Sequence, residues 1–149
     1  MINNLTPSGE LVLEKLGINP HHLSTDFPTR EQRLQYRAVV QWLTDYKPKS
    51  DATNLEKVRG YLEAFHHLCQ VEDWERASKI LFIRLNTPTN EELHAQLNTW
   101  GYYGEQIDLY SRIVGKLSPS LDTFFFMVWA RLTMFWETML RRLSILSRV

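Results

Sequence analysis

Apolar and polar residues recur with the period of a helix through most of the chain, and the clearest case is the stretch 54–85. Residues 55–69 carry one apolar stripe and residues 74–81 carry a second, which is the pattern of a helix with one buried face. The link between them contains Glu72 and Asp73, and Asp is a preferred residue at a helix start. Neither helix buries its stripe alone, so the short link predicts an antiparallel hairpin.

Capping boxes mark three expected helix starts. In such a box, a Ser or Thr side chain and a Glu or Gln three residues later each bond the backbone N–H of the other residue. The helix that starts at Thr29 is predicted to run to about Tyr46, because the connector 47–51 is polar and contains a proline. A shorter helix is expected over residues 7–16 with Thr6 as its cap, and Ser118 opens a last helix. The three boxes are Thr29 with Gln32, Thr53 with Glu56, and Thr89 with Glu92.

These elements predict an all-α chain in four parts. No segment shows the strict alternation of apolar and polar residues, bounded by hairpin turns, that indicates a β-strand. The expected parts are an N-terminal helical segment (1–50), a hairpin (51–88), a second and degenerate hairpin (89–117), and a C-terminal helix (118–149).

Residues 61–81 resemble a tetratricopeptide repeat, which is a helix–turn–helix unit of about 34 residues. Trp74 followed by Ala77 matches the start of the second helix of such a repeat, and Pro88 falls where its closing proline is expected. Phe65 departs from the family, which prefers a small residue near that place. The resemblance implies antiparallel helical hairpins stacked as a short, right-handed, tetratricopeptide-like solenoid.

The segment 42–117 also resembles the helical-repeat portions of large signalling NTPases, which sense a ligand through their repeats. That resemblance implies the sensor or repeat part of a larger signalling protein. The chain has no Gly-rich loop ending in Gly-Lys-Ser or Gly-Lys-Thr, so no nucleotide-binding part is expected here. We expect a protein or peptide partner, with neither enzyme activity nor a cofactor.

Charge and cysteine content narrow the class further. The chain has 17 basic and 17 acidic residues, whereas a nucleic-acid partner usually demands a basic face. The edge formed by Arg76, Lys79 and Arg84 is modest, and we expect it to be solvated. Cys69 is the only cysteine, so no internal disulfide forms and a cytoplasmic setting is favoured. The N-terminus lacks the basic and apolar regions of a signal peptide, and no apolar run is long enough to span a bilayer.

Stacked hairpins leave a concave face, lined by the first helix of each pair, on which a partner's peptide or helix lies. The polar residues expected on that face offer hydrogen bonds rather than chemistry, which predicts a non-catalytic interaction module or scaffold. These candidates are Arg59, Glu63, His66, His67 and Gln70 on the first hairpin, and Glu92, Gln96 and Thr99 on the second.

The alternative hypothesis is a small helical metal-binding protein or enzyme that uses His66, His67 and Cys69. His66 and Cys69 are three residues apart and share a helix face, which supplies two zinc ligands with His94 as the third donor. A cysteine that packs in the hairpin core as a small hydrophobe accounts for the same pattern without a metal.

Residues 124–149 differ from the rest of the chain, because apolar residues surround the whole helix instead of forming a stripe. We expect exposed apolar surface there and self-association through this helix. Codons that the genetic code allows for residues 126–142, read from the third nucleotide, spell YGLGSTYYVLGDYAKA, which resembles the core of a tetratricopeptide repeat. We therefore expect that the reading frame shifted near residues 123–126 and that the chain is the truncated front of a longer repeat protein.

Overall fold

The computed structural model describes residues 5–146, so the expected segments 1–50 and 118–149 each extend beyond the described residues. Within the described range the all-α prediction is confirmed, because the chain forms helices and no strand. One extended contact occurs in this range, an isolated bridge between Arg84 and Glu92.

The chain divides into two compact units, Met1–Trp100 and Gly101–Val149. The expected hairpin 89–117 therefore has one helix in each unit. The first unit holds α1 (Gly9–Leu16), α2 (Leu23–Asp26), α3 (Arg30–Thr44), α4 (Asn54–Lys57), α5 (Arg59–Gln70), α6 (Trp74–Leu81) and α7 (Leu93–Thr99), and the second holds α8 (Tyr103–Ile113) and α9 (Pro119–Leu146).

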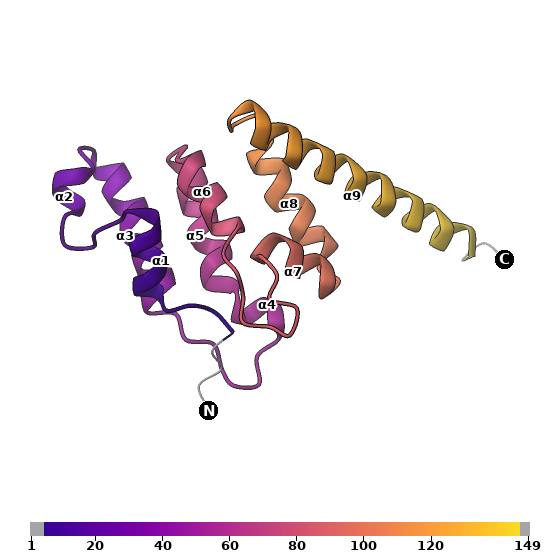
Figure 1. Cartoon of the computed structure of the whole chain (residues 1–149), viewed down its shortest axis with the longest axis horizontal. Coiled ribbons are helices and arrows are strands. Elements are labelled where there is room, and N and C mark those ends of the chain that lie inside the picture. Colours follow the sequence, from indigo (N-terminus) through magenta and orange to yellow (C-terminus); the bar gives the residue numbers. More distant parts are fainter. Residues whose placement is uncertain (1–4, 147–149) are drawn as a thin grey trace. The chain divides into compact units, whose positions relative to one another are not determined.

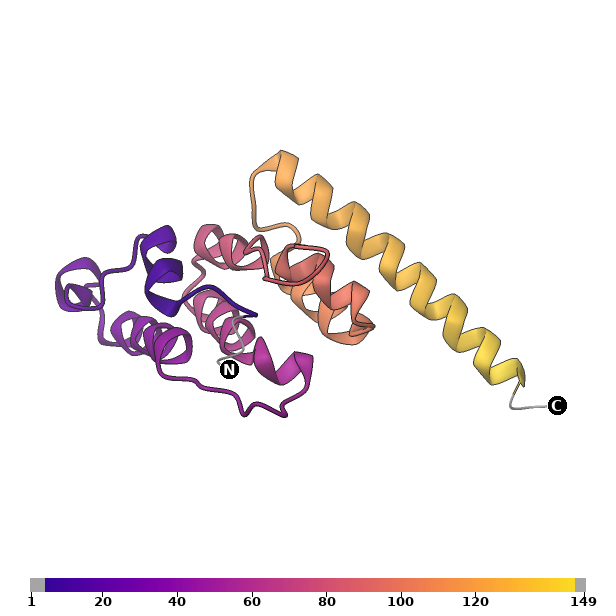
Figure 2. The ribbon, with the colours of Figure 1, turned by 60° about the horizontal axis from the view of Figure 1, so that its bottom comes forward.

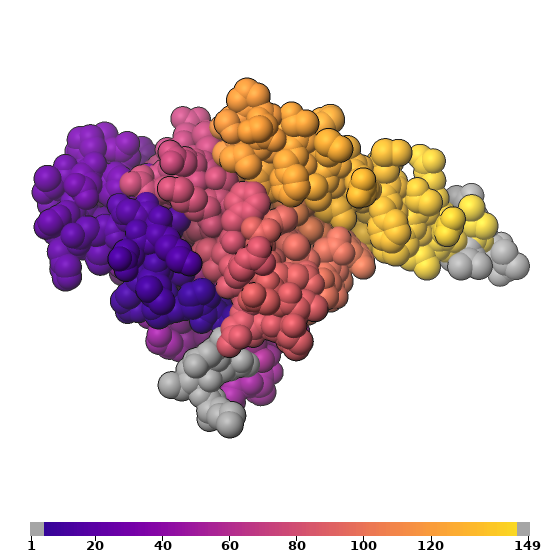
Figure 3. Space-filling view, viewed as in Figure 1, coloured from indigo at the N-terminus to yellow at the C-terminus, as the bar shows by residue number. Residues whose placement is uncertain are grey.

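The longer helices of the first unit form two layers. α3 packs along α5, and α5 packs on α6 as the predicted hairpin (Figure 1). Figure 2 shows α3 beside α5 in one layer and α1 beside α6 in the other. On the face drawn in Figure 3, side chains fill the gaps between these ribbons. The core contains residues of both predicted stripes, and Phe65, Leu68, Ala77 and Leu81 are fully buried.

Two predicted capping boxes are confirmed. The Thr29 hydroxyl accepts from the backbone N–H of Gln32 at 3.1 Å, and the Gln32 side chain accepts from the N–H of Thr29 at 3.3 Å. Thr53 and Glu56 form the same pair of bonds at 3.2 and 3.1 Å. These local signals fix where α3 and α4 begin.

The predicted start of the first helix is wrong. α1 is capped by Ser8, whose hydroxyl accepts from the N–H of Leu11 at 3.3 Å, rather than by Thr6. The chain just before Ser8 is held outside the helix, because the Pro7 carbonyl accepts a hydrogen bond from the Tyr61 hydroxyl at 2.8 Å.

The predicted box of Thr89 with Glu92 is also wrong. α7 begins at Leu93, whose N–H donates to the Ile83 carbonyl at 2.8 Å. The Thr89 hydroxyl donates to Gln96 Oε1 at 3.3 Å. The N–H of Leu93 is bonded to the Ile83 carbonyl, and the Thr89 hydroxyl is bonded to Gln96. The helix therefore does not start at Thr89.

Two glycines set how closely the helices of the first unit approach each other. A Cβ on Gly60, in the first turn of α5, would lie 2.6 Å from the Trp42 carbonyl oxygen of α3. A Cβ on Gly9, at the start of α1, would lie 2.1 Å from the Leu43 carbonyl oxygen. A backbone oxygen cannot move aside as a flexible side chain does, so both close contacts require glycine. Just before Gly60, Val58 leaves the helical conformation and divides the expected helix into α4 and α5.

In the second unit, α8 packs antiparallel on the first part of α9. Tyr110 contacts Phe125 with ring centroids 5.5 Å apart, and Tyr103 contacts Phe135 at 6.1 Å. α9 begins at Pro119, as predicted from the sequence.

α9 extends past its neighbour, because it has 28 residues and α8 has 11. Large apolar side chains stay exposed along it, including Phe126 at 53%, Met134 at 69% and Ile145 at 63%. Within residues 5–146, neither α9 nor any other helix combines the length and the apolar content that a membrane span requires.

Candidate interaction surface

α3 and α5 run antiparallel, and contacts between them define a strip of surface. His67 Nδ1 is hydrogen-bonded to Gln35 Oε1 at 2.7 Å. The Arg59 guanidinium lies over the Trp42 ring, 5.6 Å from its centroid. Glu63 lies between these two contacts along α5 and pairs with Arg59 at 3.7 Å. We call the surface formed by these five residues the α3–α5 strip.

The chemistry of the α3–α5 strip suits contact with another protein. The side chains of Arg59 and Glu63 are 57% and 33% exposed, and Trp42 and His67 are half-buried. Arg and large aromatic residues supply much of the binding energy in protein interfaces. Three of the eight predicted partner-binding residues, Arg59, Glu63 and His67, are thus brought together. Trp42 and Gln35 were missed, because only the α3–α5 packing places them beside α5.

The residues of the metal hypothesis lie on α5 as well. His66 is half-buried with its ring 5.6 Å from that of Phe65, and Cys69 is half-buried. Gln70, another predicted partner-binding residue, is exposed at the end of α5. In the part of the chain that the structure describes, no three His, Cys, Asp or Glu side chains gather where a metal ion could be held.

The three candidates near α7 make contacts within their own segment. Gln96 is buried, and its Oε1 accepts a hydroxyl hydrogen bond from the preceding loop at 2.8 Å. Thr99 donates to Glu91 Oε2 at 2.7 Å. Glu92 Oε1 lies 3.6 Å from His94 Nε2. Burial lowers the pKa of His94 below its ordinary value, and the Glu92 carboxylate offsets only part of this effect.

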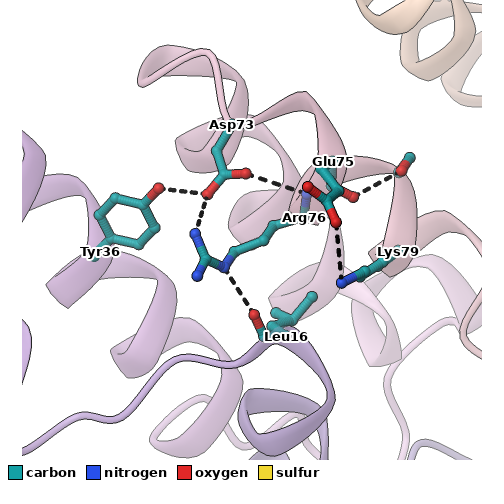
Figure 4. Close-up of polar contacts among 7 residues, drawn as sticks. Leu16, Tyr36, Asp73, Glu75, Arg76 and Lys79 are labelled. Atoms are coloured by element: carbon teal, nitrogen blue, oxygen red, sulfur yellow. Dashed lines mark hydrogen bonds and ion pairs between the residues drawn. The ribbon is translucent and has the colours of Figure 1, made fainter. Parts of the chain in front are cut away.

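A polar network joins the two layers of the first unit (Figure 4). The Tyr36 hydroxyl on α3 donates to Asp73 Oδ2, and Arg76 Nη1 on α6 donates to the same oxygen at 2.8 Å. Arg76 Nε donates to the Leu16 carbonyl at the end of α1, at 2.7 Å. Asp73 also caps α6, as predicted, by accepting from the N–H of Arg76 at 3.2 Å. One carboxylate and its Arg partner therefore hold three helices.

Aromatic rings cover this network. Phe27 stacks on Tyr36 with centroids 3.6 Å apart, and the Arg76 guanidinium lies 5.9 and 5.8 Å from the two ring centroids. Burial and the bond to Asp73 raise the pKa of Tyr36 above its ordinary value. Burial acts to lower the pKa of Arg76, but Asp73 outweighs it and the pKa is raised. The expectation of a solvated Arg76 is wrong, because its charge is compensated inside the unit.

A cavity of about 760 Å³ adjoins the α3–α5 strip. Its walls come from residues 5–9, from the end of α3 with residues 47–50, from Lys57 at the end of α4, and from the start of α5. Trp42, which carries Arg59 on its ring, is part of the wall, as is Gly60. The sequence alone did not indicate this cavity, because its walls are far apart along the chain.

No protein-family model, curated protein or solved structure matches this chain. Function is therefore inferred from the residues and contacts of the chain itself.

Proposed function

We propose that the first unit is a non-catalytic helical-repeat module that binds a protein or peptide along the α3–α5 strip. The observation that carries this proposal is the contact of Arg59 with Trp42, at 5.6 Å on partly exposed surface. Arg and Trp are enriched at the energetic centres of protein interfaces, and rigid helices on both sides hold them in place. A cytoplasmic setting, in which Cys69 stays reduced, fits this function.

The α5–α6 hairpin supports the tetratricopeptide-like part of the proposal. Asp73 caps α6, Trp74 follows, and Ala77 is fully buried, which agrees with a small residue where the helices of such a repeat touch. A stack of such hairpins forms a right-handed solenoid that serves as a scaffold or as the sensor part of a signalling protein.

The test is a selection of random 16-residue peptides on the purified, immobilised chain, followed by affinity measurements on variants. Charge reversal in the strip, as Arg59→Glu or Glu63→Lys, should weaken the selected peptides by about tenfold, which is about 1.4 kcal/mol. The melting temperature should stay nearly unchanged, because both side chains of the pair are partly exposed and such pairs add little stability.

Lys79→Glu is the matched control for these variants. Lys79 pairs with Glu75 at 3.6 Å with the same i,i+4 spacing as Arg59 and Glu63, but on α6 instead of α5. The control should leave peptide affinity unchanged. Equal losses from the strip and from Lys79→Glu, or a failure to enrich any peptide, would remove the proposed function.

We further propose that the codons of residues 126–142 contain a tetratricopeptide repeat in a second reading frame. Met and Trp have one codon each, so several residues of that frame do not depend on codon choice. We call a residue of the second frame forced when every allowed codon choice gives the same amino acid. The forced Gly from Trp129-Ala130 lies seven residues before the forced Gly from Trp136-Glu137. Asn or Asp must follow the latter, as in the Gly-Asp-Tyr turn of the expected repeat. The forced residues are Gly from Met127-Val128, Gly from Trp129-Ala130, Val from Met134-Phe135, Leu from Phe135-Trp136, and Gly from Trp136-Glu137.

The gene tests this second proposal directly. Restoring the frame after Asp122 should extend the repeat pattern through and beyond the codons of residues 143–149. An early stop codon in that frame would end the proposal, while leaving the binding function of the first unit untouched.

A further inference from the structure

Three aromatic residues contribute to the wall of the cavity beside the α3–α5 strip, and we call this part of the lining its aromatic wall. Tyr46 and Tyr61 line it together with Trp42. The Tyr46 hydroxyl donates to the Glu56 carbonyl at 2.8 Å, and the Tyr61 hydroxyl donates to the Pro7 carbonyl at 2.8 Å. Both hydroxyl groups are therefore anchored on backbone carbonyls, and the half-buried rings of Tyr46 and Trp42 offer apolar surface to the cavity, whereas Tyr61 is buried.

The same cavity concentrates positive charge. Lys47, Lys49 and Lys57 line it, and none of its described lining residues is acidic. Within the described residues, none of these lysines is in an ion pair, whereas Arg59 and Arg76 each have a carboxylate partner. Charge of one sign around a hollow of low dielectric constant attracts ligands of the opposite sign.

Size and wall chemistry narrow the ligand class. A volume of about 760 Å³ lies in the range of pockets that enclose a drug-sized ligand or several side chains, and greatly exceeds a single inorganic anion. Aromatic walls favour apolar groups, and three lysines favour carboxylates. The net charge of zero gives no basic field for a nucleic acid.

We propose that this cavity binds an acidic peptide segment of the partner. An apolar side chain of the peptide packs against the aromatic wall, and flanking carboxylates pair with the three lysines. This inference rests on the proposed function, because the cavity and the α3–α5 strip share Trp42 and would engage one partner. It adds the chemistry of that partner, which the strip alone does not specify.

The probe is a fluorescein-labelled peptide of three Glu-Leu-Glu repeats, measured by fluorescence anisotropy with the full chain at low ionic strength. The triple variant Lys47→Gln, Lys49→Gln, Lys57→Gln should bind it at least about tenfold more weakly. The double variant Lys47→Gln, Lys49→Gln, which changes only exposed connector residues, should lose part of the affinity and keep the parental melting temperature.

The control variant Lys15→Gln, Arg30→Gln, Arg37→Gln removes the same charge from exposed positions outside the cavity lining. It should bind the probe within about twofold of the parent. A probe with Ser in place of Leu should bind more weakly, because the aromatic wall then has no apolar group to bury.

Three outcomes would overturn the inference. They are an equal loss in the control variant, full affinity of the Ser-containing probe, and displacement of the probe by inorganic phosphate at concentrations comparable to those of the peptide. Each would reveal attraction to charge alone. None of them affects the strip, because Arg59→Glu and Lys79→Glu test the proposed function separately with library peptides.

Discussion

The α5–α6 hairpin and α9 are both helical and both rich in apolar residues, but they differ in how many of their large apolar side chains are buried. In the hairpin, Phe65, Leu68 and Ile80 are fully buried. In α9, Met134 and Ile145 are 69% and 63% exposed. Helix formation is thus common to both regions, but α9 carries apolar residues on all sides, and only some of them, such as Phe125 and Leu132, are buried.

Apolar content and burial are therefore separate properties of a helix. α5 is flanked by α3 and α6, so its stripe meets a partner on each side. α9 meets α8 only along part of its length, since Tyr103 at the start of α8 already contacts Phe135. Residues of α9 beyond that point have no second helix in the described part of their unit.

The largest expected effect distinguishes the mostly buried carboxylate of Asp73, 12% exposed, from an exposed one. Asp73→Ala should lower the free energy of unfolding by about 3 kcal/mol, because it removes a helix cap and leaves Arg76 and Tyr36 without their shared partner. Asp108→Ala breaks an exposed pair with Arg112 in the second unit and should change it by less than about 0.5 kcal/mol. Urea unfolding followed by circular dichroism measures both, and equal effects would contradict the structural role of Asp73.

Substitution of one glycine in each unit compares a close helix contact with an open position. Gly60→Ala should destabilise the first unit by about 1–3 kcal/mol, because its Cβ would press on the Trp42 carbonyl oxygen. Gly104→Ala in α8 has open space around its Cβ and should stabilise its helix by about 0.5–1 kcal/mol. Thermal melts read out both changes, and a neutral Gly60→Ala would show that α3 and α5 do not approach so closely.

A third prediction concerns association rather than folding. The variant Leu140→Gln, Leu143→Gln, Ile145→Gln should convert a self-associating chain to a monomer in analytical ultracentrifugation, because it removes exposed apolar surface from α9. Stability should change by less than about 0.5 kcal/mol, as for exposed positions generally.

The control for this prediction is Leu11→Gln with Leu34→Gln, two leucines that are each 52% exposed in the first unit. Scattered exposed leucines are ordinary, so this variant should associate as the parent does. A parent that sediments as a monomer at all concentrations would contradict the predicted association.

The smallest effect is a pH dependence in the first unit. Burial keeps the pKa of His94 below its ordinary value, so the unfolded chain takes up a proton near pH 6.5 before the folded chain does. Stability should therefore fall as pH drops from 7.5 to 5.5. His94→Gln should flatten this dependence, whereas His21→Gln, in an exposed position, should keep it. An unchanged slope in His94→Gln would contradict the assignment.

Local signals in the sequence predicted much of the fold. Thr29 and Thr53 start helices as expected, since a capping box needs only residues three apart. Thr89 has the same capping pattern but starts no helix, because the Leu93 N–H donates to the Ile83 carbonyl of the preceding loop. That competing contact joins separate segments, so no capping pattern reveals it.

The candidate site shows the same limit. Arg59, Glu63 and His67 were predicted on one face, because a helical spacing places them together. Trp42 joins them only through the packing of α3 on α5. Lys47 and Lys49 line the cavity together with Lys57 of α4 only because the connector folds beside α5. Positions on one helix can be derived from spacing, whereas contacts between helices depend on tertiary packing.

We propose that a partner binds on the α3–α5 strip and not on the more apolar α9. Hydrogen–deuterium exchange of the full chain, with and without a peptide selected from the library, tests this most directly. We predict slower exchange in α3 and α5, lost in Arg59→Glu and kept in Lys79→Glu. Slower exchange confined to α9, with α3 and α5 unchanged, would contradict the claim.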